Sequence, residues 1–440
     1  MLIQLNIILL IYLFVLLGSV FSHGFYSFPE IILLSSAFII FLFYWIKRKF
    51  EFIDKNSLNF LLWLNFYISL FLSLLLYGGL YQNTIQLIVI SRLILVFLLF
   101  IAIIPLFQSR YSDKNIIIYF LIFFISVLIL RILMILSSPN PHIDVFSIIK
   151  YGSNAFINGQ NPYVISYPKL YEGIIPNYYS YFPGSLLLLS PFVYFFNDPR
   201  WGLVFFEALS IIILYKLSIK IKIKGLTTYS TRVILPLVFS FHPMALYLLE
   251  ESYLDGLLIS VFLYFLYSLY RKYSYIFTAF ILAFCILIKQ TMLIVPLFFI
   301  SNVNRKILVY SIIFLFLIVT PFFIWSPKDF FVDTILFYFI NPSFLQRHDG
   351  LNLNSLVFTL IGRDLSPLIL LSVSILLFII IQKKRKRIGD SFIGIALWYF
   401  GFFLFNRLSF ANYYFFINGI IIIAVYSILL DKSLDTSADI

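Results

Sequence analysis

The sequence predicts an all-α, polytopic transmembrane protein with about 12 to 14 spans and with amphipathic interface helices in its first large outer loop. Hydrophobic residues make up 62% of the 440 residues and charged residues 11%, whereas soluble proteins average about 50% and 25%. Many uninterrupted apolar runs approach the roughly 20 residues that a helix needs to cross a bilayer. Because these runs are continuous and do not alternate with polar residues, they favour helices over a β-barrel.

About 14 apolar runs follow one another along the chain, and several are shorter than an ideal span. The first four contain few polar residues besides Arg92, so residues 1–115 are expected to form a four-helix membrane module that is a scaffold or faces lipid. Residues 116–430 form the predicted catalytic membrane domain, with outer segments at 137–200 and 325–365, and residues 431–440 form a short cytoplasmic tail. The runs are 2–21, 31–46, 58–77, 85–107, 116–136, 201–218, 231–249, 256–270, 274–288, 290–301, 307–324, 366–382, 391–405 and 412–430.

The positions of Lys and Arg predict the orientation of these spans, because both residues are enriched in short cytoplasmic loops. If the runs above are the spans, all the basic clusters fall on one side of the membrane together with both termini. The segments 137–200 and 325–365 and the turns at 250–255 and 406–411 then lie on the outer side. The clusters are Lys47 to Lys49, Arg110 with Lys114, Lys216 to Lys224, Arg271 with Lys272, Arg305 with Lys306, and Lys383 to Arg387.

One further apolar segment, Phe182 to Phe196, is short and contains Pro183 and Pro191. If it crossed the membrane, the basic cluster Lys216 to Lys224 would lie outside, against the positive-inside rule. A run of this length often lies in the interface or dips into one leaflet. We therefore expect an interface helix here, preceded by a second amphipathic helix that begins near Asp144.

Composition also excludes several classes of function. The formal net charge of +12 is spread over loops and forms no basic face on a soluble domain, so nucleic acid is not an expected partner. Cys285, the only cysteine, lies inside an apolar run, which excludes a disulfide scaffold or a cysteine metal site. No HExxH or paired-His spacing occurs, and neither a metal nor a cofactor is predicted. Leu2 to Phe21 lacks a positive n-region and is interpreted as a transmembrane helix, not as a signal peptide.

Asp144 is an isolated carboxylate that follows "SPNPH" about eight residues beyond the run 116–136. Val145, Phe146, Ile148 and Ile149 then recur at helical spacing, which predicts a surface-lying amphipathic helix. An aspartate at the start of a helix is favoured for structural reasons alone, as an N-cap. A cap and a functional carboxylate are therefore both open interpretations.

Three other polar features share the predicted outer side. The turn "EESYLDGLL" holds Glu250, Glu251 and Asp255, and carboxylates this close disfavour one another unless a cation, a hydroxyl-rich ligand or a shared proton compensates. Lys289 interrupts an apolar run, where a charge normally faces a cavity or a partner. Arg347 carries a planar fork of donors suited to a phosphate. Each feature also has an alternative interpretation. The 250–255 turn could be solvated, Lys289 could snorkel to the interface from a short turn, and Arg347 could belong to a solvated loop.

A carboxylate and outward-facing cations at a membrane surface fit the transfer of a sugar from a polyprenyl-phosphate carrier. The departing phosphate needs cationic partners, and the acceptor hydroxyl needs a general base, for which a carboxylate can serve. Nucleotide sugars are unnecessary, in agreement with the absence of a Gly-rich phosphate loop or a soluble domain. A transporter is the main alternative, although we find no internal repeat; a polymerase or ligase of polyprenyl-linked glycans is another.

At this point the motifs resemble the GT-C superfamily of integral membrane glycosyltransferases. "YGSNAFINGQNPY" (151–163) after Asp144, followed by "YFPG" (181–184), is similar to the Asp, A-x-x-x-G-x-x-P-Y and Y-P-P series of mannosyltransferases that use polyprenyl-phosphate mannose. The second proline of Y-P-P is absent. "EESYLDGLL" is similar to the family's G-Q-x-D-x-L turn, "LIKQT" to its K-Q element, and "RLSFANYYFF" to its late H-x-Y pattern, with Asn412 in place of the histidine. The resemblance covers roughly residues 116–430.

The resemblance implies an inverting transfer, with mannose as the expected sugar and arabinose and glucose left open. The implied partners are a polyprenyl-phosphate sugar donor, a lipid-linked or protein-linked glycan acceptor, and membrane lipids. The bias toward Ile, Lys, Asn and Tyr suggests an AT-rich prokaryotic genome, hence a plasma-membrane protein with its active site on the outer face. The implied roles are catalytic base for Asp144, phosphate binding for Lys289, Arg347 and Lys150, and sugar or acceptor binding for Glu251, Asp255, Tyr163, Tyr181, Gln290, Arg407 and Tyr413.

Overall fold

A computed structural model of the chain describes residues 2–47, 57–76, 78–107, 112–170, 176–223, 225–337 and 347–438. Within these ranges the regular elements are helices, and the β contact is a single bridge between Phe25 and Gly350. Each of the predicted apolar runs is helical over most of its length. The helices of the N-terminal module are α1 (Leu2–Val20), α2 (Phe28–Lys47), α3 (Ser57–Leu75) and α4 (Ile85–Ile103), extended by η1 (Ile104–Phe107).

The remaining helices follow the predicted order, with extra short elements in the two outer segments. They are α5 (Asp113–Ser137), α6 (Asp144–Ile157), α7 (Gly184–Phe196), α8 (Arg200–Ser218), η2 (Ser230–Ile234), α9 (Leu235–Leu237), α10 (Met244–Glu250), α11 (Asp255–Tyr270), α12 (Tyr275–Ile288), η3 (Gln290–Phe298), α13 (Arg305–Trp325), α14 (Pro327–Phe331), η4 (Val332–Leu336), α17 (Leu353–Ile361), α18 (Pro367–Gln382), α19 (Ile388–Phe405) and α20 (Ala411–Ala438).

Eight of the helices in the described ranges are long and apolar enough to cross a membrane, or nine if α10 and α11, bent by 112°, form one broken span. Four shorter apolar helices, among them α7, α12 and α18, accompany them. The chain is therefore an integral membrane protein with a polytopic helical fold. The count of 12 to 14 spans stays a prediction, because it depends on whether the shorter helices also cross.

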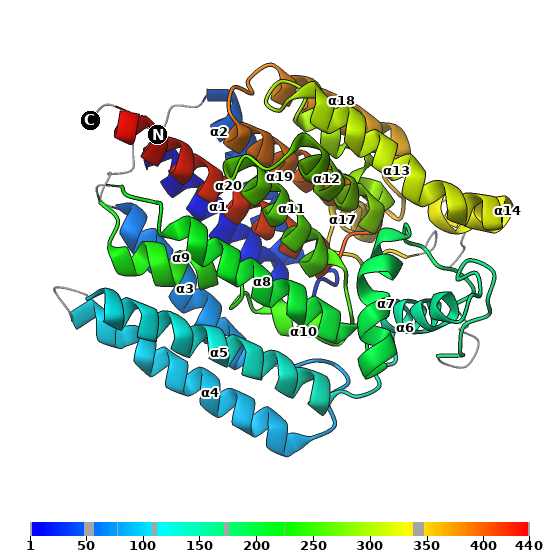
Figure 1. Cartoon of the computed structure of the whole chain (residues 1–440), viewed down its shortest axis with the longest axis horizontal. Coiled ribbons are helices and arrows are strands. Elements are labelled where there is room, and N and C mark those ends of the chain that lie inside the picture. The colour runs from blue at the N-terminus through cyan, green and yellow to red at the C-terminus, as the bar shows by residue number, and fades with distance from the viewer. Residues whose placement is uncertain are drawn as a thin grey trace.

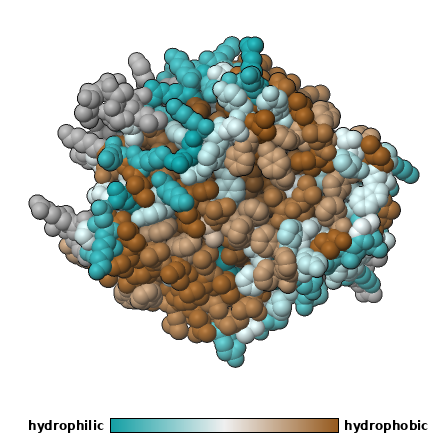
Figure 2. Space-filling view, viewed as in Figure 1, coloured by the Kyte–Doolittle hydropathy of each residue, from teal (hydrophilic) through white to brown (hydrophobic). Residues whose placement is uncertain are grey.

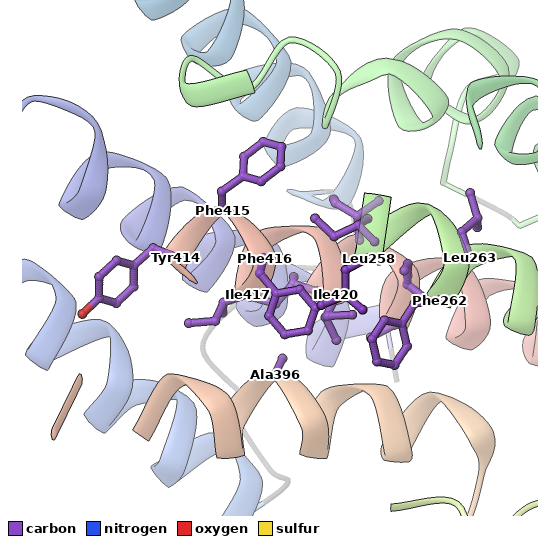
Figure 3. Packing of buried hydrophobic residues seen from close by; sticks show 14 of the residues in the cluster. Leu258, Phe262, Leu263, Ala396, Tyr414, Phe415, Phe416, Ile417 and Ile420 are labelled. Carbon is purple, nitrogen blue, oxygen red and sulfur yellow. The ribbon is translucent and has the colours of Figure 1, made fainter. Parts of the chain in front are cut away.

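Helix α20 lies at the centre of the bundle, where it packs against α1, α11 and α19. Its residues from Ala411 to Leu430 are apolar on every side, and a helix of that kind is stable only when neighbours surround it. Figure 3 shows Phe415 and Phe416 leaving α20 in different directions, with Phe416 facing Ala396 of α19 and with Phe262 of α11 close by. Within the predicted N-terminal module, α1 packs against α20 and α2 against α19.

Helix α7 runs across the direction of α5 and α8 (Figure 1). With 13 residues, it spans about 20 Å, less than the roughly 30 Å of a hydrocarbon core. Its orientation and length agree with the predicted interface helix over Phe182 to Phe196. Figure 2 shows hydrophobic residues across the middle of the same face, with hydrophilic residues gathered toward its upper-left and lower-right edges.

Parts of three basic clusters lie close to one another or to the C-terminal part of α20, and Figure 1 shows the N- and C-termini near one another. Lys384 donates to the carbonyl of Ile46, next to Lys47, and Arg385 donates to that of Phe298. The Lys222 amide donates to Ser433 Oγ over 3.2 Å. The side of the membrane on which the clusters lie stays a prediction, and Arg48, Lys49, Arg110 and Lys224 lie outside the described residues.

Three predicted elements differ in form. The run 231–249 is broken into η2, α9 and α10, with Pro236 and Pro243 in the interrupted part, where proline removes a backbone donor. The run 290–301 is a tight 3₁₀ helix, η3. The tail 431–440 continues α20 as far as Ala438 and is therefore largely helical.

A buried ion pair joins α5 and α8 between the two ends of the bundle. Arg131 donates to both carboxylate oxygens of Glu207 over 2.8 Å and to the carbonyl of Ser240 over 2.6 Å. The Arg131 side chain is only 3% exposed and that of Glu207 26%. Because a charge within a membrane is costly without a partner, this pair constrains how α5, α8 and the broken segment before α10 fit together.

We predict that Arg131→Met lowers the free energy of unfolding by about 3–5 kcal/mol, because it leaves the Glu207 carboxylate without its cation. Thermal or denaturant unfolding of the purified protein in detergent measures this loss. The double variant Arg131→Met/Glu207→Gln should recover part of it.

The matched control is Arg232→Met. Arg232 forms an ion pair with Asp113, whose side chain is 82% exposed, so its loss should cost less than about 1 kcal/mol. Equal effects of the two single substitutions would contradict the structural role given to Arg131.

Candidate functional site

A cavity of about 590 Å³ opens at the end of the bundle opposite the termini. Its wall is made by turns and helix ends from many parts of the chain. Seven of the residues predicted for the site line it: Asp144, Tyr181, Glu251, Lys289, Gln290, Arg347 and Tyr413.

Asp144 is half-buried at the first position of α6. Its Oδ1 accepts a hydrogen bond from the amide of Val145 over 2.9 Å, and its Oδ2 accepts one from the Tyr178 hydroxyl over 2.9 Å. The N-cap position belongs to Ile143, and Asp144 directly follows it, where its carboxylate accepts from a helix N-terminal amide. The carboxylate also faces the cavity at the positive end of a helix, where the helix dipole favours a negative charge.

The three carboxylates of the 250–255 turn are all buried, so the alternative of a solvated turn is wrong. Glu250, Glu251 and Asp255 are 0%, 1% and 2% exposed. Glu250 accepts from the amides of Leu80 and Tyr81 over 2.5 and 3.1 Å. Glu251 lines the cavity, and Asp255 points to Lys289. Each carboxylate therefore has different surroundings, which removes much of the mutual repulsion expected from their spacing.

Lys289 lies at the break between α12 and η3, with an extended backbone. Its Nζ is 2.8 Å from each oxygen of Asp255, and Asp255 also accepts from Asn412 Nδ2 over 3.0 Å. The Lys289 side chain is 8% exposed, so it does not snorkel to the interface. An ammonium has three N–H donors, and Asp255 takes two of them. Lys289 thus keeps one donor for the cavity, while Asp255 is its counter-charge and is not part of the cavity wall.

Arg347 enters the cavity from the second outer segment. It donates to both oxygens of Asp349 over 2.9 and 2.8 Å, and its guanidinium lies 4.5 Å from the centre of the Phe410 ring. This hydrogen bonding holds the pKa of Asp349 below its usual value. It also raises the pKa of Arg347, to which the negative charge of Asp144 adds. Arg347 is therefore a permanent cation whose surroundings include the charge of Asp144.

Besides Asp255, three predicted site residues lie apart from the cavity wall. The ammonium of Lys150 sits over the ring of Phe146, 5.4 Å from its centre. Tyr163 is buried and donates to the carbonyl of Tyr181 over 3.0 Å, so it supports the wall from behind. Arg407 pairs with Asp364. These three residues were predicted because they lie in or near the motifs, but their side chains do not line the cavity.

The cavity also includes residues that sequence reasoning missed. Tyr178 lies in the tyrosine-rich stretch "NYYSYFP", whose density of hydroxyls near Asp144 was a usable signal. His23, Phe25 and Tyr81 come from the N-terminal helices, and no local pattern linked them to the site. The packing of α1 on α20 and of α2 on α19 brings His23 and Phe25 there, and the hydrogen bond from its amide to Glu250 brings Tyr81.

A further buried carboxylate, Asp333 of η4, lies behind the cavity wall. Its Oδ2 accepts from the amide of Tyr179 over 2.7 Å, which fixes the strip that carries Tyr178 and Tyr181. Burial raises the pKa of Asp333 to about 7, although the hydrogen bond from Tyr179 opposes this effect. At neutral pH the carboxyl group is therefore near its midpoint.

Among the described residues no group of three or more His, Cys, Asp or Glu side chains is placed to hold a metal ion. The chain matches no protein-family model, no curated protein sequence and no solved structure. The geometry of the cavity is therefore the basis for assigning a function.

Since the pKa of Asp333 is higher in the folded protein than its ordinary value of 3.8, protonation stabilises the fold. We predict that the unfolding temperature rises as the pH is lowered from about 8 to about 5.5, and that this gain is lost as the pH rises through about 7. Thermal unfolding of wild type and Asp333→Asn measures the effect as the difference between their pH profiles. Parallel profiles would contradict it.

Proposed function

We propose that the protein is a membrane glycosyltransferase that moves a sugar from a polyprenyl-phosphate carrier to an acceptor hydroxyl, with Asp144 as the general base. The observation that supports this most directly is that Asp144, Lys289 and Arg347 line one cavity although they come from three distant segments. This set combines an accessible carboxylate with two cationic donors, as the reaction requires. By resemblance, mannose is the expected sugar.

In the proposed reaction, the acceptor oxygen attacks the anomeric carbon while its proton passes to the carboxylate of Asp144. A carbon–oxygen bond forms, the bond between the anomeric carbon and the phosphate oxygen breaks, and the polyprenyl phosphate leaves. Attack from the face opposite the phosphate inverts the configuration. Hydrogen bonds from Val145 and Tyr178 hold the carboxylate in place before the acceptor arrives, and this preorganisation lowers the cost of reaching the transition state.

The departing phosphate would meet the remaining donors of Lys289 and Arg347. Both cations are already oriented, Lys289 by Asp255 and Arg347 by Asp349. Donors fixed in advance stabilise developing charge better than mobile ones, because little reorganisation is needed at the moment of reaction. Asp255 thus contributes to the proposed reaction by positioning Lys289.

The lipid tail of the carrier has an apolar path beside the cavity. A crevice between α8, α11 and α20 begins at Leu248 and Tyr253, which also line the cavity, and continues along residues such as Leu263 and Ile423. A polyprenyl chain could lie along this surface while its phosphate remains at the polar end. If the basic end is cytoplasmic, the reaction takes place on the outer face, in a prokaryote at the plasma membrane.

We predict that Asp144→Asn lowers the transfer rate by at least about 100-fold, because the amide cannot take the proton of the acceptor. The measurement is transfer from polyprenyl-phosphate mannose in detergent or proteoliposomes, with unfolding temperatures compared to show that the variant is folded. Normal turnover by a folded Asp144→Asn protein would remove this mechanism. Accumulation of solute in proteoliposomes without any carrier lipid would favour a transporter.

We expect Lys289→Gln to raise the KM for the polyprenyl-phosphate donor by about tenfold, since a neutral amide replaces the charged donor to the phosphate. Lys150→Gln is the matched control, because Lys150 lies outside the cavity wall and should leave this KM unchanged. The paired variant Lys289→Gln/Asp255→Asn separates loss of the donor from an unpaired carboxylate. If both single lysine variants behaved alike, Lys289 would have no specific role.

A further inference from the structure

We propose that the turn between α1 and α2, together with Glu251 and Tyr247, forms a subsite for an acceptor that is itself a sugar. The N-terminal helices would then select the acceptor and would not act only as a scaffold. This inference rests on the proposed function, which it deepens by naming the chemical class of the acceptor.

The α1–α2 turn is held rigidly against the rest of the site. At its start, Glu30 Oε1 accepts from the amides of Phe21 and Ser22 over 2.7 and 3.1 Å. Gly24 has a φ of +82°, and a Cβ there would lie only 1.9 Å from the Ala411 nitrogen. This close approach of two backbones requires glycine.

The same turn also contacts the segment that carries Arg347. The amide of Tyr26 donates to the carbonyl of Asp349 over 2.7 Å, and Phe25 forms a β bridge with Gly350. Its two anchors, α20 and the 347–350 segment, both belong to the wall of the cavity. The position of the turn is therefore built into the site.

The turn presents two aromatic rings to the cavity. His23 has a φ of +53° and meets the ring of Tyr247 edge-on, with 5.3 Å between the centres. Phe25 meets Phe410 in a similar way at 6.1 Å. Both His23 and Phe25 line the cavity. The phenyl ring of Phe25 and the imidazole of His23 together suit a sugar, which offers both apolar C–H faces and hydroxyl groups.

Glu251 provides an independent sign of a missing ligand. It lines the cavity and is 1% exposed. The hydroxyl groups of Tyr247 and Tyr253 reach its carboxyl group, yet its Oε2 has no hydrogen-bond partner among the described residues. A buried carboxyl oxygen without a partner is costly, and a hydroxyl group of a ligand would be a partner for it whether Glu251 is ionised or protonated.

Asp144 and Glu251 line the same cavity. Burial raises the pKa of Glu251 to about 8, and the charges of Glu250 and Asp144 add to this effect. A single acceptor could therefore give its reacting hydroxyl to Asp144 and a second hydroxyl to Glu251. A serine or threonine side chain has only one hydroxyl, whereas a sugar has several. This favours a glycan over a protein side chain as the acceptor.

The second turn of the N-terminal helices supports the same wall. Glu250 holds the amides of Leu80 and Tyr81, and a Cβ at Gly79 would lie 1.8 Å from the Glu250 carboxylate. Leu80 and Tyr81 line the cavity. Both N-terminal turns are thus fastened to residues beside Glu251 or Arg347.

The experiment compares transfer from polyprenyl-phosphate mannose to octyl mannoside and to a serine-containing peptide, with hydrolysis of the donor by water as an internal reference. The variants are Glu251→Gln and His23→Asn, since asparagine tolerates a positive φ. We expect the wild type to use the glycoside and not the peptide. Each variant should raise the KM for octyl mannoside by about tenfold, a larger change than in the KM for the donor.

His348→Asn is the matched control, because His348 pairs with Asp364 away from the cavity wall. The inference would be overturned if both variants kept the wild-type KM for octyl mannoside, or if the wild type transferred sugar to the peptide as well as to octyl mannoside. Either result would leave the proposed function intact. If the wild type transfers no sugar, the proposed function fails. Equal binding of octyl mannoside to wild type and Glu251→Gln, measured by calorimetry, would then also overturn the subsite.

Discussion

Pairing of buried charge is the constraint on which the architecture of this protein depends. The turn between α10 and α11 places three carboxylates where water has little access, and such groups are tolerated only with partners. Glu250 meets two backbone amides of the α3–α4 turn, and Asp255 meets Lys289 after α12. One short turn therefore connects the N-terminal helices to the later half of the bundle. The remaining carboxylate, Glu251, lines the cavity next to Tyr247 and Tyr253.

Hydropathy was sufficient to predict the helical class and the place of nearly every long helix, because continuous apolar runs leave few alternatives in a bilayer. It could not predict that the run 231–249 is broken, although Pro236 and Pro243 were visible. Helix breaks depend on whether neighbouring groups satisfy the freed backbone, and that is a tertiary property. The break between α12 and η3 is also a tertiary feature. Lys289 at this break is buried and paired with Asp255, and the sequence alone did not identify that partner.

The site was predictable where its residues were unusual for their surroundings. Asp144, Glu251, Lys289 and Arg347 are charged residues in an apolar chain, and all four line the cavity. Lys150, Tyr163 and Arg407 were included because they lie near a motif, and proximity in sequence does not fix the direction of a side chain. His23 is the opposite case, because its turn reaches the cavity only through contacts with residues near 349 and 411. Contacts between residues so far apart in the chain leave no periodic pattern in the sequence.

The anchoring of the α1–α2 turn has a consequence for biogenesis. Gly24 and Phe25 are synthesised well before their partners Ala411 and Gly350, which lie more than 300 residues later in the sequence. During synthesis this wall must stay open until the late helices enter the bundle beside α1. The cavity would thus close only when the segment that carries Arg347 and the start of α20 reach the α1–α2 turn.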